Sequence, residues 1–193
     1  MKKWITAAGI VGLILALYGL ISAIFYSSAT WYDYFVIGGA FFLGYVNYKL
    51  KNESVLGLLE ENKLRVFGNY ALYAIAGIII ELVGRFLLHL WEYPSLNHAA
   101  ETIRIFIIFY PFGFFFIYES FVLIKSKLQS FGLTVVVATL VNAFLHEIPN
   151  TFAWEWRYTI PYVTFEILRI NIVVIVGWAI LIAVSLLVKR ILP

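Results

Sequence analysis

Six long apolar stretches dominate the sequence, and each is close to the length that a helix needs to cross a lipid bilayer. They cover about residues 4–25, 32–48, 67–91, 102–124, 131–147 and 161–188. A helix rises about 1.5 Å per residue, so about 20 apolar residues cross the hydrocarbon core. Only 13% of the residues are charged, whereas a soluble domain carries about 25%. We therefore predict an all-α, polytopic membrane protein with one transmembrane domain, residues 1–193, built as a bundle of six transmembrane helices.

Basic side chains indicate how these helices are oriented. Lysine and arginine occur at both chain ends and in the second and fourth connections, whereas the other connections contain Arg157 and no lysine. Cytoplasmic connections of membrane proteins carry an excess of lysine and arginine. We therefore expect both termini in the cytoplasm and the protein in the inner or plasma membrane. Residues 53–65, where leucines alternate with charges, fit either an interfacial helix or a solvated loop. The basic residues form no patch, so no nucleic-acid partner is expected.

Ionisable residues interrupt the third apolar stretch. Glu81, Arg85 and His89 are four residues apart, so on a helix they form one stripe. Gly77 and Gly84 lie on or beside the same face, where small residues let a neighbouring helix come close. A charged residue at a helix centre costs about 2.5–3.5 kcal/mol on insertion scales. Such residues are tolerated when they are paired or line a wet cavity, and they suggest function.

Polar residues of the later helices are predicted to lie at the same depth as this stripe. They are Arg104 on the fourth helix, Asn142 and His146 on the fifth, and Tyr162, Glu166 and Arg169 on the sixth. By helix rise, all of them lie within roughly 15 Å of the outer boundary. We therefore predict a polar pocket in the outer half of the bilayer.

The residue types in this layer favour acid–base chemistry on a lipid-like molecule. We expect a membrane-embedded enzyme or binding protein for a lipid- or isoprenoid-like ligand, in contact with membrane lipids. The expected catalytic residues, which would move a proton, are Glu81, His89, His146 and Glu166. The expected substrate-binding residues are Arg85, Arg104, Asn142, Tyr162 and Arg169. The arginines would orient an anionic head group, because guanidinium groups bind carboxylate or phosphate in a bidentate manner.

Three other interpretations fit the same residues. A small proton-coupled transporter is the first, and with so few residues it would need a homodimer for alternating access. A non-catalytic accessory subunit with a structural polar layer is the second, because each buried glutamate has an arginine within one helical turn. A zinc or iron site on His89, His146 and Glu147 is the third, since these are suitable ligand types. No metal motif is present, and we expect no cofactor.

Two spacings resemble motifs of the CAAX-protease and bacteriocin-processing family. Glu81 to Arg85 is similar to the end of its EExxxR motif, and His146 to Asn150 matches its HxxxN motif. Ile80 stands where that family has its first glutamate. The resemblance covers less than half of the chain, so we assign none of the family's residue roles here.

Overall fold

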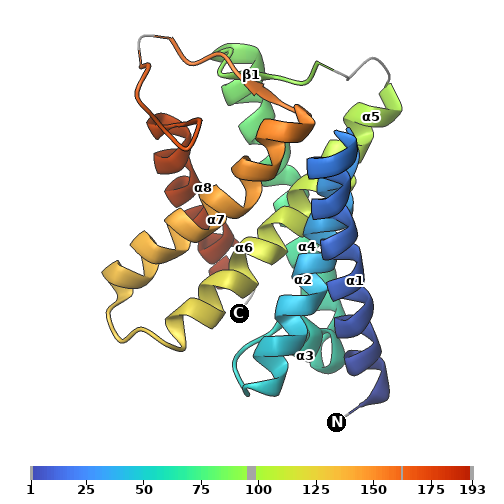
Figure 1. Ribbon diagram of the computed structural model, residues 1–193. Helices are drawn as coiled ribbons and strands as arrows, with labels where there is room; N and C mark the ends of the chain where they lie inside the picture. The colour runs from blue at the N-terminus through green and yellow to red at the C-terminus, as the bar shows by residue number, and fades with distance from the viewer. Residues whose placement is uncertain (1, 95–98, 162, 192–193) are drawn as a thin grey trace.

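The chain folds into a bundle of long helices covered at one end by short strands (Figure 1). The computed structural model describes residues 2–94, 99–161 and 163–191. Within these residues, five helical segments are long and apolar enough to cross a membrane. They are Lys3–Tyr26, Lys63–Leu87, Thr102–Lys125, Phe131–Ala153 and Ile172–Ile191. The helical class predicted from the sequence is thus confirmed, and five of the described helices have the length and composition needed to cross a membrane.

The elements follow one another with short connections. The first half contains α1 (Lys3–Tyr26), α2 (Trp31–Lys49), α3 (Val55–Glu61), α4 (Lys63–Ile80), the π-helical segment η1 (Glu81–Leu87) and β1 (Trp91–Glu92). The second half contains α5 (Ala99–Arg104), the π-helical segment η2 (Ile105–Phe109), α6 (Tyr110–Lys125), α7 (Phe131–Ala153), β2 (Arg157–Tyr158), β3 (Glu166–Ile167), β4 (Ile170–Asn171) and α8 (Ile172–Ile191). The predicted interfacial segment 53–65 therefore divides into α3 and the start of α4.

α1 and α2 form a closely packed pair. α1 buries a stripe of small residues that includes Gly12 and Ala16, and small residues let helix backbones approach. A Cβ atom added to Gly38 of α2 would lie only 2.3 Å from the backbone nitrogen of Ala16. The two main chains therefore touch at this point, and no larger residue fits at Gly38.

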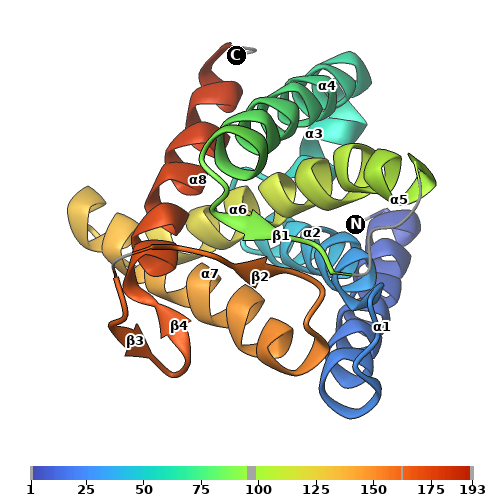
Figure 2. The ribbon, with the colours of Figure 1, turned by 90° about the horizontal axis from the view of Figure 1, so that it is seen from above.

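α2 is enclosed by other helices and packs chiefly against α1 and α6 (Figure 2). Its buried residues include Tyr32, Asp33, Phe35 and Asn47. α2 is not among the five apolar segments, because its polar and tyrosine side chains lower its hydropathy. Composition thus identifies five crossing helices within the described residues, where six were expected. Burial among helices lets α2 keep polar groups that lipid would not tolerate.

Pro111 accounts for the irregular start of α6. Proline lacks a backbone N–H, so the carbonyl of Ile107, four residues earlier, loses its helical partner. The hydroxyl of Tyr70 on α4 donates to that carbonyl instead. The π-helical segment η2 lies directly before this proline, and the Tyr70 bond holds α4 against it.

The last helix begins later than predicted, because a β-hairpin takes the place of its first turns. α8 starts at Ile172, whereas the apolar pattern predicted a helix from about residue 161. Leu168 and Arg169 have φ angles of 52° and 67°, and a two-residue hairpin turn between strands favours such values. A right-handed helix cannot pass through two consecutive residues of this kind. Glu166 and Arg169 therefore lie outside any spanning helix.

α7 ends later than predicted, at Ala153 instead of about residue 147. Its last turns contain Pro149, followed by Asn150, whose side chain organises the loop beyond the helix. The Asn150 Oδ1 accepts from the backbone N–H groups of Glu155 at 3.0 Å and Trp156 at 3.2 Å. These bonds turn the chain back so that Glu155 and Trp156 are buried.

A short antiparallel ladder covers the upper end of the bundle in Figure 1. β1 follows η1 and β2 follows α7, and Trp91 lies opposite Tyr158 in this ladder. Opposite residues of an antiparallel pair place their side chains on the same face. Both chain ends, α3 and the α6–α7 turn lie in the lower half of the same view. The helical segment formed by α4 and η1 also ends earlier than expected, at Leu87 instead of about residue 91.

Candidate functional site

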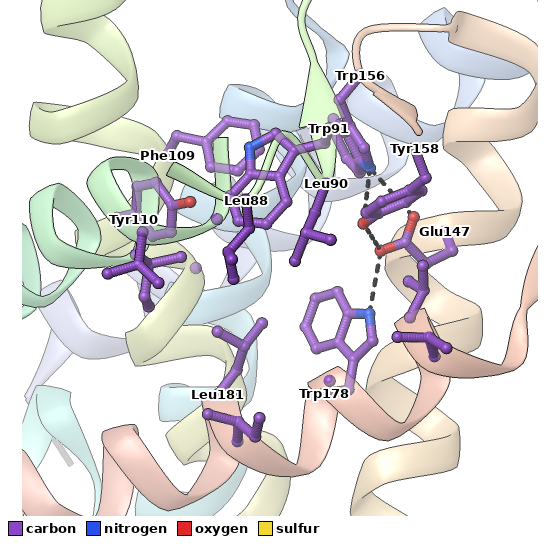
Figure 3. Close-up of a pocket in the computed structure, with 18 of the residues that line it drawn as sticks. Leu88, Leu90, Trp91, Phe109, Tyr110, Glu147, Trp156, Tyr158, Trp178 and Leu181 are labelled. Carbon is purple, nitrogen blue, oxygen red and sulfur yellow. Dashed lines mark hydrogen bonds between the residues drawn. The ribbon is translucent and has the colours of Figure 1, made fainter. Parts of the chain in front are cut away.

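A cavity of about 540 Å³ lies beneath the β1–β2 ladder. Its walls come from η1, η2, α6, α7 and α8, and nearly all of its lining side chains are aromatic or aliphatic. Figure 3 shows Tyr110 toward one end of this space and Glu147 toward the other. The ring-bearing residues of the lining are Tyr32, Trp91, Tyr93, Phe109, Tyr110, Phe114, Trp156, Tyr158 and Trp178. Among the described lining residues, Glu147 alone carries a carboxyl group.

The cavity reaches the surface of the bundle between α4–η1 and α8. Ile79 and Val83 on one side, and Val176 and Ile180 on the other, line the cavity and also expose large parts of their side chains. Nearer the lower end, the Tyr73 hydroxyl of α4 donates to a backbone carbonyl of α8 at 3.1 Å. The opening is therefore lateral and bordered by aliphatic side chains, and in a membrane it would face the lipid chains.

Glu147 is held at the inner end of the cavity by three neutral donors. Its Oε1 accepts from the Tyr158 hydroxyl at 2.7 Å and the Trp178 Nε1–H at 3.0 Å. Its Oε2 accepts from the Trp156 Nε1–H at 3.1 Å. The side chain is only 3% exposed, and within the described residues no ion pair includes it. A buried carboxyl group is thus satisfied by hydrogen bonds alone.

Glu81 lies one layer behind the opposite wall. Its Oε1 accepts from the hydroxyls of Tyr93 and Tyr110, each at 2.8 Å, and from the Trp91 Nε1–H at 3.3 Å. The Arg85 guanidinium is 3.9 Å from its Oε2. The sequence prediction of a buried Glu81 beside Arg85 is therefore correct, and three aromatic donors complete the arrangement.

Two glycines make room for the rings that bind Glu81. A Cβ atom on Gly77 would lie 2.4 Å from the ring of Tyr110, and one on Gly84 would lie 1.8 Å from the ring of Trp91. The close-packing face predicted around Glu81 thus receives aromatic side chains. Because Trp91 and Tyr110 also line the cavity, these glycines help to fix its shape.

His146 is completely buried in a cage of rings beside the cavity. Its Nδ1 is 2.7 Å from the Tyr32 hydroxyl, and the rings of Phe116 and Trp178 pack within 5 Å of it, centroid to centroid. Its Nε2 has no hydrogen-bond partner among the described residues. His146 does not itself line the cavity, but Tyr32 and Trp178 do, so it supports the wall.

Both terminal nitrogens of Arg104 are paired with the protein's own acids. Its guanidinium lies 2.8 Å from Asp33 and 2.9 Å from Glu155. Arg104 therefore joins the top of α2 to the loop after α7, and it is not available for a ligand head group. Asn142 is also structural, because its amide bonds with Ser120 on α6 at 2.8 Å.

Three of the residues expected at the site lie elsewhere, and a fourth is not among the described residues. Glu166 and Arg169 are exposed on the β3–β4 hairpin, and His89 is exposed in a left-handed conformation after η1. Tyr162 lies outside the described residues. Within those residues, no three acidic, histidine or cysteine side chains are placed to hold a metal ion, so His89, His146 and Glu147 do not converge.

The sequence offered one overlooked signal for this cavity. Trp178 lies in the middle of the last apolar stretch, whereas tryptophan in membrane helices is enriched at the two interfaces. A central tryptophan therefore indicates a buried acceptor for its N–H group, which is Glu147. The pairing of Trp91 with Tyr158 joins distant segments, and no local pattern predicts it.

We expect Glu81→Gln to lower the melting temperature. The substitution removes the charge that pairs with Arg85 and weakens three hydrogen bonds, at a cost of about 1–3 kcal/mol. The measurement is a thermal melt of purified variant and wild type in one detergent. Glu92→Gln, at an exposed position of β1, is the matched control and should be nearly neutral. Equal melting temperatures for Glu81→Gln and wild type would contradict a role in stability.

Glu155 should make stability depend on pH. Burial raises the pKa of Glu155 to about 8, and the nearby Arg104 guanidinium offsets only part of this effect. The folded protein then keeps a proton on Glu155 that the unfolded chain releases above about pH 4.5. Its contribution to stability is complete below about pH 4.5 and is lost as the pH rises to about 8.

Comparison with Glu155→Gln isolates that contribution. Between about pH 5 and pH 8, the melting temperature of the wild type should fall relative to this variant, and the difference should be constant at higher pH. If the melting temperature of the wild type instead rose relative to that of Glu155→Gln over this range, the result would mean that Arg104 keeps Glu155 ionised.

No family model matches the chain, and neither a curated protein nor a solved structure is similar to it. A function for this protein must therefore rest on the chemistry of its own cavity.

Proposed function

We propose that this chain is a multi-pass membrane protein that binds a lipid- or isoprenoid-like molecule in the aromatic cavity. The observation that supports this most directly is an apolar cavity that opens laterally and has one carboxyl group at its inner end. Its volume of about 540 Å³ is within the usual range for ligand pockets. An apolar tail would lie along the aliphatic opening, and the polar end of the ligand would contact Glu147.

This proposal changes the residues expected to act on the ligand. Glu147 takes the place of Glu81 and Glu166, because Glu81 lies behind the wall and Glu166 is exposed on a hairpin. The arginines do not line the cavity. Binding therefore rests on rings and aliphatic groups, with Glu147 and the Tyr158 hydroxyl as the polar contacts.

Acid–base catalysis on the bound molecule is a second candidate function. The observation in its favour is the Glu147–Tyr158 pair, with 2.7 Å between carboxylate and hydroxyl at the cavity wall. A general acid or base must lie within hydrogen-bonding reach of the reacting group, and this pair has that access. A change in mass of an added polyisoprenoid or membrane lipid, lost in Glu147→Gln, would favour catalysis over simple binding.

We also propose that α2 forms a sixth crossing and that both termini are cytoplasmic, in the inner or plasma membrane. α2 has 19 residues, and at about 1.5 Å per residue its length approaches the thickness of the hydrocarbon core. The lysines cluster at the chain ends, after α2 and in the α6–α7 turn. Since cytoplasmic loops carry the excess of basic residues, the cavity would open in the outer half of the bilayer.

Filling the cavity should abolish ligand binding. A Cβ atom on Gly177, which lines the cavity, meets no atom within 4 Å, so Gly177→Leu places a side chain in open space. We expect native mass spectrometry of gently solubilised wild type to show a co-purified lipid that is at least about tenfold depleted in this variant. Gly132→Leu also enters open space, but at the start of α7, and should retain the lipid. Equal occupancy in both variants would contradict the proposal.

Single cysteines should report the topology, because the chain contains none of its own. Thr30→Cys precedes α2, and Thr164→Cys precedes β3, and both positions are exposed. In intact cells, we expect a membrane-impermeant maleimide to label these two. Lys49→Cys and Gln129→Cys, also exposed, should react only after the cells are opened. Labelling of Thr30→Cys and Lys49→Cys from the same side would show that α2 does not cross.

A further inference from the structure

The buried carboxyl groups of the upper half differ in whether the protein supplies a positive partner. Glu81 has Arg85 at 3.9 Å, and Glu155 has Arg104 at 2.9 Å. Glu147 is in no ion pair within the described residues, and no lysine, arginine or histidine lines the cavity that it faces. Among these three buried glutamates, Glu147 is the one that both faces the cavity and lacks a positive partner.

The hydrogen bonds of Glu147 hold both of its oxygens as acceptors. The Trp156 and Trp178 N–H groups bind different oxygens, and an indole N–H can only donate. With the Tyr158 hydroxyl, three donors occupy a carboxylate that has about four acceptor positions. This arrangement suits the ionised form, and an ionised carboxylate without a positive partner is costly in an apolar interior.

Aromatic rings around the same carboxylate provide a second feature that suits a cation. Trp156, Tyr158 and Trp178 surround Glu147 at one end of the cavity (Figure 3), and Trp91 lies opposite Tyr158 in the β1–β2 ladder. A cation over the face of tryptophan or tyrosine is attracted by the ring quadrupole, and aromatic cages are used to bind quaternary ammonium groups. The cavity thus combines one carboxyl group, which can carry a negative charge, with a group of electron-rich rings.

We propose that the ligand of the cavity is a cationic amphiphile, with an organic ammonium head group against Glu147 and an apolar tail in the opening between α4 and α8. This inference rests on the proposed function and adds the charge of the ligand. The sequence predicted an anionic head group, whereas we now expect a cationic one, because Arg85 and Arg104 are paired with the protein's own acids. A lipid with a primary amine and one with a trimethylammonium group share this chemistry.

Three ligands with the same C12 chain test the head group. They are dodecyltrimethylammonium, dodecanol and dodecanoate, each isotope-labelled and measured by equilibrium dialysis against the full chain in lipid nanodiscs, with empty nanodiscs as background. We expect the ammonium compound to bind wild type at least about tenfold more tightly than the alcohol, and dodecanoate to bind most weakly. Equal affinities, or tighter binding of dodecanoate, would overturn the inference.

Variants separate this inference from the proposed function. Glu147→Gln keeps the shape of the side chain and should remove the preference for the ammonium compound while leaving dodecanol binding within about twofold. Glu92→Gln should keep the preference. Gly177→Leu should abolish binding of all three ligands. If all three bind equally and Gly177→Leu abolishes this binding, the cavity is a neutral lipid site, so the charge inference fails and the proposed function stands.

Two outcomes would end both proposals. They are failure of every ligand to bind wild type above the nanodisc background, and binding that Gly177→Leu does not reduce. If Glu147→Gln does not fold, as its melting curve would show, the comparison of three head groups on the wild-type chain still decides the charge of the ligand.

Discussion

The upper half of this structure depends on carboxyl groups that are buried away from water. Glu81, Glu147 and Glu155 are each at most 3% exposed, and a polar group buried without hydrogen bonds is strongly unfavourable. Glu81 and Glu147 receive their donors from tyrosine and tryptophan. These side chains bring an O–H or N–H group while burying a large apolar surface. The polar network and the aromatic core are therefore built from the same residues.

This construction also explains how a large apolar cavity persists inside a helical bundle. A cavity walled only by aliphatic side chains can shrink as its surroundings relax. Here the rings of the wall are held in place by directional bonds: Tyr110 to Glu81, and Tyr158 and Trp178 to Glu147. The β1–β2 ladder then ties the two carboxyl networks together through opposite residues. The shape of the cavity follows from polar contacts that lie partly behind its surface.

Sequence reasoning succeeded where local pattern determines structure. Apolar length identified the five long helices that could cross a membrane, and the spacing of Glu81 and Arg85 with Gly77 and Gly84 identified a buried polar face. It was wrong for residues 161–171, because an apolar segment rich in aromatic and β-branched residues suits a strand as well as a helix. The depth calculated for Glu166 assumed helix rise, and the β-hairpin removed that assumption.

The arginines show why residue types alone did not determine the charge of the site. In the sequence, Arg85 and Arg104 were expected to bind an anionic head group, since guanidinium groups suit carboxylate and phosphate. In the folded chain, Arg85 lies beside Glu81, and Arg104 bridges two acids from separate segments. The second pairing depends on the loop turned back by Asn150, which no periodicity predicts. Because both arginines are paired inside the protein, Glu147 remains as the one carboxyl group among the described lining residues, and this is the basis for proposing a cationic ligand in place of an anionic one.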